Sequence, residues 1–358
     1  MGNMFRPTTV AARRILKRAA IQSGLEAVSL VSKAGLMPDA RGLGAIFTLH
    51  HVRPAIRKEF DPAAHLTVTP EFLDASITRL KADGYLPVAL QDLPDYLARA
   101  DRPGPAMVFT LDDGYRDNDQ FARPVFEKHQ VPYTVFIAGG FVDRSHSIWW
   151  ETAELLLGQI DEFIFDFGDG EETLPTRSLM EKYAAFDRLN NALACAPQLA
   201  IVERLDLQAR AAGICPTAIV DREVMDEAEL RQLTATPLAE LGAHTVSHPN
   251  LAHLGADEMA AEIRQSADRL AEITGETPRT FAYPYGDRCA AEAREYQAAK
   301  KLGFKLAVTT NPGTLKAESL QNPFSLRRIS LNGYYQKSRY VNALASGIPF
   351  KLYGSDHG

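Results

Sequence analysis

Short apolar runs alternate with helical patterns along most of the chain. From residue 45 onward, helices with one apolar face are predicted at 70–83, 118–129, 256–274 and 290–302. Strands are predicted at 45–49, 86–90, 106–111, 133–138, 240–243, 280–283, 305–310 and 326–331. Strands that alternate with helices form a parallel sheet with the helices outside it. The pattern therefore predicts an α/β fold, with the sheet either open or closed into a barrel.

Two segments depart from this alternation. Residues 150–235 carry long helical patterns and an acidic turn, and we interpret them as a mostly helical insertion between two sheet units. Trp149 and Trp150 at its start could line a sugar groove or, more commonly for such pairs, pin the insertion to the core. Residues 9–32 have apolar positions at helical spacing with basic residues between them. We thus expect an N-terminal basic amphipathic helical segment at 1–45 and one domain at 46–358, interrupted at about 150–235.

Charge is divided unevenly between these parts. Residues 1–45 carry a net charge of +5 and the remainder −11, within a total of −6. A basic amphipathic helix can lie on an anionic membrane surface, which makes peripheral membrane contact one interpretation. A helix that caps the domain with its charges in solvent is the commoner use of such a pattern, and we favour it. The acidic body argues against nucleic-acid binding, which needs a basic face.

Composition narrows the class of protein further. With 46% hydrophobic and 23% charged residues, the 358-residue chain can bury a core. Cys195, Cys215 and Cys289 lack CxxC spacing, so neither a disulfide scaffold nor a cysteine zinc site is expected. No apolar run approaches the ~20 residues of a membrane span, and the N-terminus lacks the apolar core of a secretory signal. We therefore expect a soluble cytoplasmic protein, with the inner face of the membrane as the alternative location.

Two carboxylates follow one of the predicted strands. Asp112 and Asp113 come directly after the run at 106–111, and Gly114 allows the backbone to turn sharply there. Two adjacent carboxylates raise each other's pKa unless a cation lies between them. Holding both in the charged form side by side therefore costs free energy. Asp-Asp-Gly is also an ordinary turn sequence, so this segment alone does not establish a site.

Two histidines follow another predicted strand. His244 and His248 come after the run at 240–243, and imidazoles four residues apart can bind one metal ion from a tight loop. Chance pairs at this spacing are common. However, strands of a parallel sheet or barrel gather the side chains at their carboxyl ends in one crevice. One carboxylate and two imidazoles at that place form a metal-ligand set with room for water.

A third loop, Tyr283-Pro284-Tyr285-Gly286, follows the strand predicted at 280–283. Proline and glycine impose an irregular backbone, and such loops can aim a main-chain N–H at a developing oxyanion. An ordinary loop with its tyrosines packed at the rim is the alternative.

These three segments occur in the order found in the polysaccharide deacetylases. Residues 110–114, 244–249 and 283–286 resemble the motifs of the NodB-homology family, also called carbohydrate esterase family 4. The likeness spans about residues 46–330, interrupted by the insertion. It implies a distorted (β/α) barrel of about seven strands, here with a mostly helical insertion and an N-terminal helix. It also implies metal-dependent hydrolysis of the N-acetyl groups of amino-sugar polymers.

The resemblance assigns roles to individual residues. It implies that Asp113, His244 and His248 are metal ligands, and that Asp112 is the general base that takes a proton from the attacking water. The cofactor implied is one divalent ion, zinc in first place, while cobalt, nickel and manganese also suit these donors. Tyr285 stands where the family uses a backbone N–H to stabilise the oxyanion. The candidate substrate contacts are Tyr115, Tyr283, His51 and Arg328.

Three positions depart from the family's pattern. Leu111 replaces the usual phenylalanine. Ala282 stands in the place of the arginine that usually orients the base, and Arg327 or Arg328 could supply that cation instead. The Leu-x-His motif that supplies the general acid in the family is missing after Tyr285.

The first predicted strand has the character of the missing motif. The apolar run at 46–49 ends in His50 and His51. It resembles the branch that includes the biofilm poly-N-acetylglucosamine deacetylases, in which the last barrel strand has moved to the front of the chain. A permutation keeps the strand ends in place, so we predict this strand beside 326–331 and His50 as the general acid. His51 is the alternative acid, and the remaining interpretation is that both histidines only cap a strand.

The sequence therefore predicts a metal-dependent deacetylase that acts on an N-acetylated amino sugar and releases acetate. Chitooligosaccharides and poly-N-acetylglucosamine are the expected substrates. A metal amidohydrolase of the same fold that acts on a non-sugar amide is one alternative, because the motif residues contact only the amide. A catalytically inactive carbohydrate-binding relative is the other.

Overall fold

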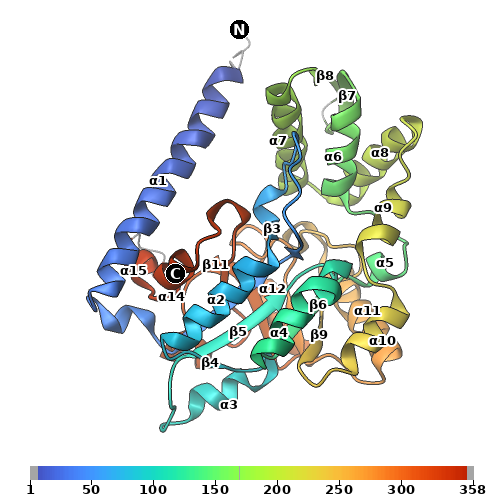
Figure 1. Cartoon of the computed structure of the whole chain (residues 1–358). Helices are drawn as coiled ribbons and strands as arrows, with labels where there is room; N and C mark the ends of the chain where they lie inside the picture. Colours follow the sequence, from blue (N-terminus) through green and yellow to red (C-terminus); the bar gives the residue numbers. More distant parts are fainter. Residues whose placement is uncertain (1–6, 169, 353–358) are drawn as a thin grey trace.

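The computed structural model describes residues 7–168 and 170–352, with residues 7–15 described by their backbone alone. Within this range, seven parallel strands close into a barrel in the order β1-β12-β11-β10-β9-β6-β5, with β5 paired back to β1 (Figure 1). A short strand, β4 (Leu86–Pro87), pairs with β5 outside the ring. The predicted α/β barrel is therefore confirmed. The barrel strands are β1 (Gly44–Leu49), β5 (Ala106–Leu111), β6 (Tyr133–Ile137), β9 (Ala239–Ala243), β10 (Thr280–Ala282), β11 (Leu306–Pro312) and β12 (Leu326–Ser330).

The first strand of the barrel, β1, lies between its last strand, β12, and β5. Phe47 pairs with Ile329 of β12, and all six residues of β1 pair with the six of β5. This register places Leu49 opposite Leu111, so the next residue of each strand leaves the barrel at the same rim. The position predicted for this strand beside 326–331 is confirmed.

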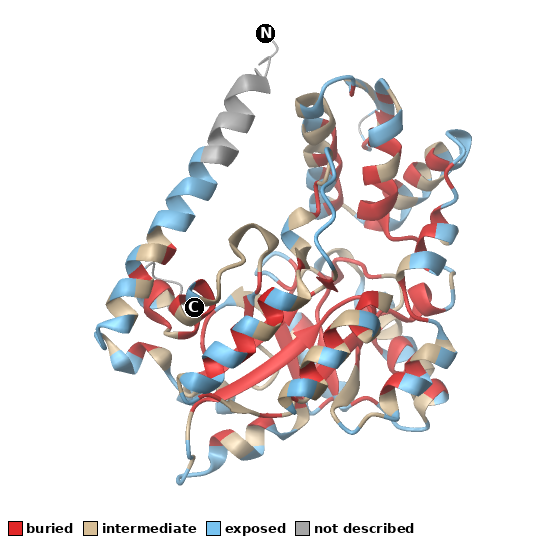
Figure 2. Cartoon of the chain, viewed as in Figure 1, coloured by how far each residue is buried: buried red, intermediate tan, exposed pale blue. Residues whose placement is uncertain are grey.

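Strands β1, β5 and β6 are apolar along most of their length because both of their faces are covered. Every residue of β1, β5 and β6 is buried (Figure 2). Ile46, Val108 and Phe136 belong to one apolar cluster. Their neighbours Phe47 and Phe109 belong to another, which includes the outer helices, and their rings stack at 5.2 Å. Alternate residues of each strand thus fill the barrel and hold the helices against it.

Helices cover the outside of the barrel. In α2 (Pro70–Ala82), Thr69 caps the first turn by accepting a hydrogen bond from the Phe72 N–H, and four apolar residues form the buried face. The helix predicted at 118–129 begins instead with a π-helical turn, η4 (Asn118–Ala122), before α4 (Arg123–His129). The other outer helices are α3 (Leu93–Ala98), α11 (Ala256–Thr274), α12 (Ala293–Lys301), α13 (Ala317–Gln321), α14 (Ser338–Ala345) and α15 (Ile348–Leu352).

Short elements complete the connections between these strands and helices. After β1 the chain forms a separate two-stranded sheet from β2 (His51–Val52) and β3 (Thr67–Val68). The 3₁₀ turns are η1 (Pro38–Arg41), η2 (Ala64–Leu66), η3 (Leu90–Asp92), η5 (Leu251–His253) and η6 (Gly333–Tyr335).

The segment between β6 and β9 forms most of a third apolar cluster, built mainly by α6 (Trp149–Gln159), α7 (Leu179–Cys195) and α8 (Gln198–Ala211). These helices stand together above the barrel in Figure 1. The segment also holds an antiparallel hairpin that the sequence analysis did not predict, in which Phe163 and Phe165 are buried on either side of the exposed Ile164. Its elements are α5 (Gly139–Val142), α6 (Trp149–Gln159), β7 (Glu162–Asp166), β8 (Glu171–Pro175), α7 (Leu179–Cys195), α8 (Gln198–Ala211), α9 (Pro216–Glu223) and α10 (Glu227–Thr234).

The N-terminal helix α1 (Pro7–Lys33) packs on the domain through its carboxyl-terminal half. Leu25 and Val28 are buried in a cluster that includes Tyr340 of α14, and Glu26 pairs with Arg339 at 2.6 Å. Residues 16–23 of the helix extend away from the barrel and are mostly exposed (Figure 2). Half of the helix thus acts as a cap, while membrane contact stays a prediction. No helix of the described chain is both long and apolar enough to cross a bilayer.

The close approach of β1 to β5 generates a stability prediction. Gly44 has φ 141°, and a Cβ at this position would lie 2.2 Å from the Ala106 carbonyl oxygen. Gly44→Ala should therefore push the two strands apart and lower the unfolding free energy by about 1–3 kcal/mol. Gly158→Ala is the matched control, since a Cβ there has nothing within 4 Å and should stabilise α6 by about 0.5–1 kcal/mol. Thermal unfolding of both variants measures the difference, and equal midpoints would contradict this account of barrel closure.

Candidate metal and catalytic site

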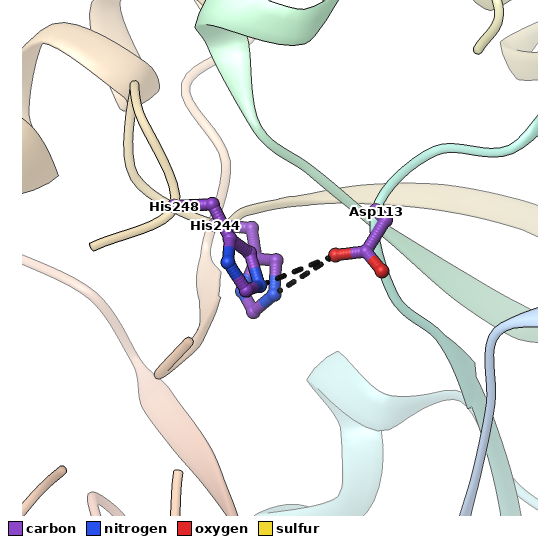
Figure 3. A group of neighbouring side chains, drawn as sticks. All are labelled: Asp113, His244 and His248. Carbon is purple, nitrogen blue, oxygen red and sulfur yellow. Dashed lines mark ion pairs between the residues drawn. The ribbon is translucent and has the colours of Figure 1, made fainter. Parts of the chain in front are cut away.

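Asp113, His244 and His248 meet at the carboxyl-terminal rim of the barrel, where β5 and β9 end (Figure 3). Oδ1 of Asp113 lies 3.5 Å from Nε2 of His244 and 3.4 Å from Nε2 of His248. All three side chains are buried, and one donor atom of each lies within 4.8 Å of the others. No other group of His, Cys, Asp or Glu in the described residues converges in this way.

The donor atoms suit a divalent metal ion. Asp113 Oδ1 is buried and has no hydrogen-bond partner among the described residues. Nδ1 of His244 lies 2.7 Å from the Ala282 carbonyl oxygen; donation to that oxygen places the proton on Nδ1 and leaves the Nε2 lone pair facing Asp113. Ligand atoms about 2.0–2.1 Å from a tetrahedral metal lie about 3.3–3.4 Å apart. The two measured spacings fit that geometry.

The backbone is strained where these side chains are presented. Seven described non-glycine residues have positive φ, and four of them lie in the three motif loops: Asp113 at 75°, Thr245 at 66°, His248 at 57° and Tyr285 at 60°. Such conformations cost about 1–3 kcal/mol each and cluster at functional sites. The packing around these loops therefore holds their backbone at positive φ values that non-glycine residues rarely adopt.

Burial and charge set the protonation of the three side chains. Burial lowers the pKa of His248 to about 4, which keeps the imidazole neutral at physiological pH, the form that binds metals. Burial alone would raise the pKa of Asp113, but the neighbouring histidines outweigh it and the net shift is downward. For His244, burial acts to lower the pKa, while Asp113 and Asp112 outweigh it and raise it.

Asp112 forms a buried ion pair with Arg328 of β12. The guanidinium donates to both carboxylate oxygens, Nη1 to Oδ1 at 2.7 Å and Nη2 to Oδ2 at 2.8 Å. It also donates to Thr110 Oγ1 and to the Thr309 carbonyl oxygen. Burial acts to raise the pKa of Asp112, but the positive charge of Arg328 outweighs it, so the carboxyl stays ionised. This geometry suits a general base.

Of the two arginines predicted as replacements for the missing cation, Arg328 is the one that reaches Asp112. Its side chain is fully buried, and its guanidinium faces the Asp112 carboxylate. Its role as a substrate contact stays a prediction.

His50 and His51 lie on opposite sides of the chain. Nε2 of His50 is 3.9 Å from Asp112 Oδ2, and its side chain is 20% exposed. Burial, the largest influence, lowers the pKa of His50. His51 is fully buried with Nδ1 2.6 Å from Asp117 Oδ2 and Nε2 3.4 Å from Glu151 Oε1. The two carboxylates thus hold both ring nitrogens of His51 away from Asp112, while its roles as alternative acid and substrate contact stay predictions.

Tyr115 and Tyr283 are held by packing and hydrogen bonds, and their role as substrate contacts stays a prediction. Both are fully buried. The Tyr115 hydroxyl accepts a hydrogen bond from Trp150 Nε1 at 2.9 Å, and its ring stacks on His51. The Tyr283 hydroxyl donates to the Phe324 carbonyl oxygen at 3.0 Å. The packed ring of Tyr283 agrees with the alternative stated for the third loop.

Tyr285 is held beside the histidines by the insertion. Its hydroxyl accepts hydrogen bonds from Trp149 Nε1 at 2.9 Å and Gln198 Nε2 at 2.7 Å, and its ring lies 5.2 Å from that of His248. The two tryptophans thus tie the insertion to the site, and both also line a cavity that His248 borders. Gln198 could not be found from the sequence, because nothing in its surroundings distinguishes it from a surface glutamine.

Comparison with known proteins agrees with this site. Residues 186–307 match the family model described as polysaccharide deacetylase. The matched range contains His244, His248 and the loop at 283–286, and the barrel brings Asp112 and Asp113 to them from outside it. The resemblance to the polysaccharide deacetylases is confirmed.

Solved structures with the same fold are deacetylases by description. The Streptococcus pyogenes deacetylase PplD in complex with acetate has a TM-score of 0.53 at 18% identity, covering 81% of this chain and 92% of that one. A de-N-acetylase from Aggregatibacter actinomycetemcomitans has a TM-score of 0.54 at 13% identity, with 84% and 98% covered. A polysaccharide deacetylase from Bacillus cereus has a TM-score of 0.50 at 16% identity, with 83% and 68% covered. Identities this low establish the fold alone. No curated protein matches the chain significantly.

The charged pair around His51 predicts a pH-dependent stability. Burial alone would lower the pKa of His51, but Asp117 and Glu151 outweigh it and raise the value to about 9. Because the folded pKa exceeds the unfolded value of about 6.5, the stabilisation is complete below about pH 6.5 and is lost as the pH rises through 9. The stability difference between wild type and His51→Gln should therefore shrink by about 3 kcal/mol between about pH 6 and pH 10.

Urea unfolding at both pH values measures this change. His253→Gln is the control, since the His253 ring bonds only a backbone carbonyl and has no carboxylate partner in the described structure. A His51→Gln effect that is constant with pH would show that the imidazolium does not form in the folded protein.

Proposed function

We propose that this chain is a metal-dependent deacetylase that removes N-acetyl groups from an amino-sugar oligosaccharide or polysaccharide and releases acetate. The observation that carries the proposal is the convergence of three buried metal-donor side chains beside an ion-paired carboxylate, Asp112, at one rim of the barrel. The polysaccharide deacetylase match over residues 186–307 supports the same activity.

The residues divide the work of amide hydrolysis between them. Asp113, His244 and His248 would hold a divalent ion, zinc in first place, which when bound polarises the amide carbonyl and lowers the pKa of water. Asp112 takes a proton from the attacking water. The Arg328 charge keeps Asp112 ionised and aligned for that transfer.

Two groups act on the other atoms of the amide. The backbone N–H of Tyr285 stabilises the negative charge that develops on the carbonyl oxygen, in a loop whose direction the insertion fixes. His50 donates a proton to the nitrogen as the C–N bond breaks, so that the amine leaves neutral. Its position 3.9 Å from Asp112 supports this role, because the acid must reach the nitrogen of the same amide whose carbon the water attacks.

Binding of the metal can be tested without turnover. Isothermal titration should give one divalent ion per chain, and His248→Ala should weaken the affinity at least tenfold, because one of three protein ligands is lost. His253→Ala, five residues further along the chain, should bind as the wild type does. Equal affinities for the two variants would contradict the proposed ligand set.

Acetate release tests the activity and the base together. The metal-loaded protein should release acetate from poly-N-acetylglucosamine fragments or chitooligosaccharides, and Asp112→Asn should retain the metal while turnover falls about 10²–10⁴-fold. This variant leaves Arg328 unpaired, so its folding is checked by thermal unfolding.

Three outcomes of this assay contradict part of the proposal. If Asp112→Asn loses the metal, Asp112 is the metal ligand and Asp113 the general base, the reverse of the proposed roles. Release of acyl groups only from non-sugar amides would replace the substrate class. Binding of the oligosaccharides without release would indicate a carbohydrate-binding relative.

A further inference from the structure

The chain leaves the barrel ladder at His50. The last residue of β1, Leu49, pairs with Leu111, and the following strand β2 joins a different sheet with β3. The barrel ladder therefore brings His50 to the rim but does not hold the backbone beyond Leu49. Other groups must hold this residue if its imidazole is to keep a fixed position at the rim.

Asp117 and Asn118 bond the backbone on both sides of His50. Asn118 Nδ2 donates to the His50 carbonyl oxygen at 2.7 Å, and the Val52 N–H donates to Asp117 Oδ1 at 3.1 Å. Asn118 Nδ2 also donates to Asp117 Oδ1 at 3.0 Å, which joins the two contacts. Oδ2 of the same carboxylate lies 2.6 Å from Nδ1 of His51. We call Asp117 and Asn118 the His50 clamp.

The clamp belongs to the loop that carries the catalytic carboxylates. Asp117 and Asn118 follow Asp113 by four and five residues, and Asn118 begins the π-helical turn η4. Asn118 is fully buried and Asp117 is nearly so. Single π-helical turns are rare and recur at functional sites. The same short segment therefore fixes the positions of Asp112, Asp113 and, across the barrel closure, His50.

We propose that Asp117 and Asn118 are positioning residues that hold His50 where it can protonate the leaving nitrogen. This inference rests on the proposed function. In the step concerned, water oxygen bonds the acyl carbon, one water proton passes to Asp112, and the C–N electron pair goes to nitrogen. That nitrogen takes its proton from His50, and the amine leaves. The acyl product keeps the second water proton and gives it to solvent to become acetate, while Asp112 loses its proton and His50 regains one by exchange with solvent. A shift of the acid by about 1 Å can lower such a rate about 10²-fold.

The test compares two acetyl compounds that differ in their need for an acid. An acetamido sugar releases an amine, which must be protonated, whereas 4-nitrophenyl acetate releases a phenolate, which leaves without a proton. Asn118→Leu keeps the side-chain volume and removes the donor to His50. It should lower amide turnover about tenfold or more through kcat, lower ester turnover much less, and leave metal affinity within about threefold of wild type.

A double-mutant cycle separates positioning from general damage. His50→Gln should reduce amide turnover at least as much as Asn118→Leu does, and the double variant should lose little more than His50→Gln alone, since both changes remove the same proton transfer. Ser76→Ala is the matched control, because it removes another buried side-chain hydrogen bond to a backbone carbonyl, in α2. It should reduce stability without changing the ratio of amide to ester turnover.

Different results would contradict the clamp and the proposed function. Equal losses on amide and ester for Asn118→Leu, or additive losses in the double variant, would overturn the clamp and leave it a purely structural contact. If Asn118→Leu fails to fold, Asn118→Ser, whose side chain is one atom shorter, is measured in the same way. A wild-type protein that hydrolyses the ester but no acetamido sugar would instead overturn the proposed function.

Discussion

The pairing of the first barrel strand with β5 is the constraint on which the site depends. Parallel strands in register reach the same level of a barrel, and here Leu49 lies opposite Leu111. The next residues, His50 and Asp112, therefore leave the barrel together, although more than sixty positions separate them in the chain. A one-residue slip would turn every side chain of the strand to the other face and remove His50 from Asp112. The backbone bond from the Asp112 N–H to the Leu49 carbonyl oxygen, at 3.0 Å, extends this pairing one step beyond the strands.

Charged side chains can be buried at the rim in two pairs, because each charge lies beside one of opposite sign. Arg328 and Asp112 form a two-point pair in the barrel interior, and His51 is enclosed by Asp117 and Glu151. An uncompensated charge at such a depth would destabilise the fold by several kcal/mol, so these pairs are stabilising only while both members are present. Asp113 differs from them, since its buried Oδ1 faces two imidazoles and no hydrogen-bond donor of the described chain. This imbalance is the physical reason to place a cation there.

Much of the architecture could be predicted from the sequence because its signals are local. Buried parallel strands read as continuous apolar runs, and polar residues at their ends mark the rim; this was enough to place Asp113, His244 and His248 at one location. The hairpin at Phe163–Phe165 was missed although its alternation of buried and exposed residues was visible, because the helical patterns around it dominated the interpretation. Other features depend on three-dimensional contacts. Whether Arg327 or Arg328 faces Asp112 is decided by the strand's pleat.

The exposure of the tyrosines and of His51 could not be read from the sequence for the same reason. The sequence that flanks a tyrosine in a catalytic motif is the same whether its ring contacts the substrate or packs in the core. The insertion decided the outcome here, since Trp149 and Trp150 bond the hydroxyls of Tyr285 and Tyr115. The insertion is thus part of the support for the site, and helices distant in sequence determine how the oxyanion loop is held.

The most direct test of the account is anomalous diffraction from metal-loaded crystals, recorded at the absorption edge of the bound ion. The account predicts one peak about 2.0–2.2 Å from Asp113 Oδ1 and from Nε2 of His244 and His248. It also predicts that His50 stands outside the coordination shell, on the Asp112 side. A peak at another place, or one with His50 as a ligand, would contradict the claim that the closing strand brings a proton donor to a three-ligand metal centre.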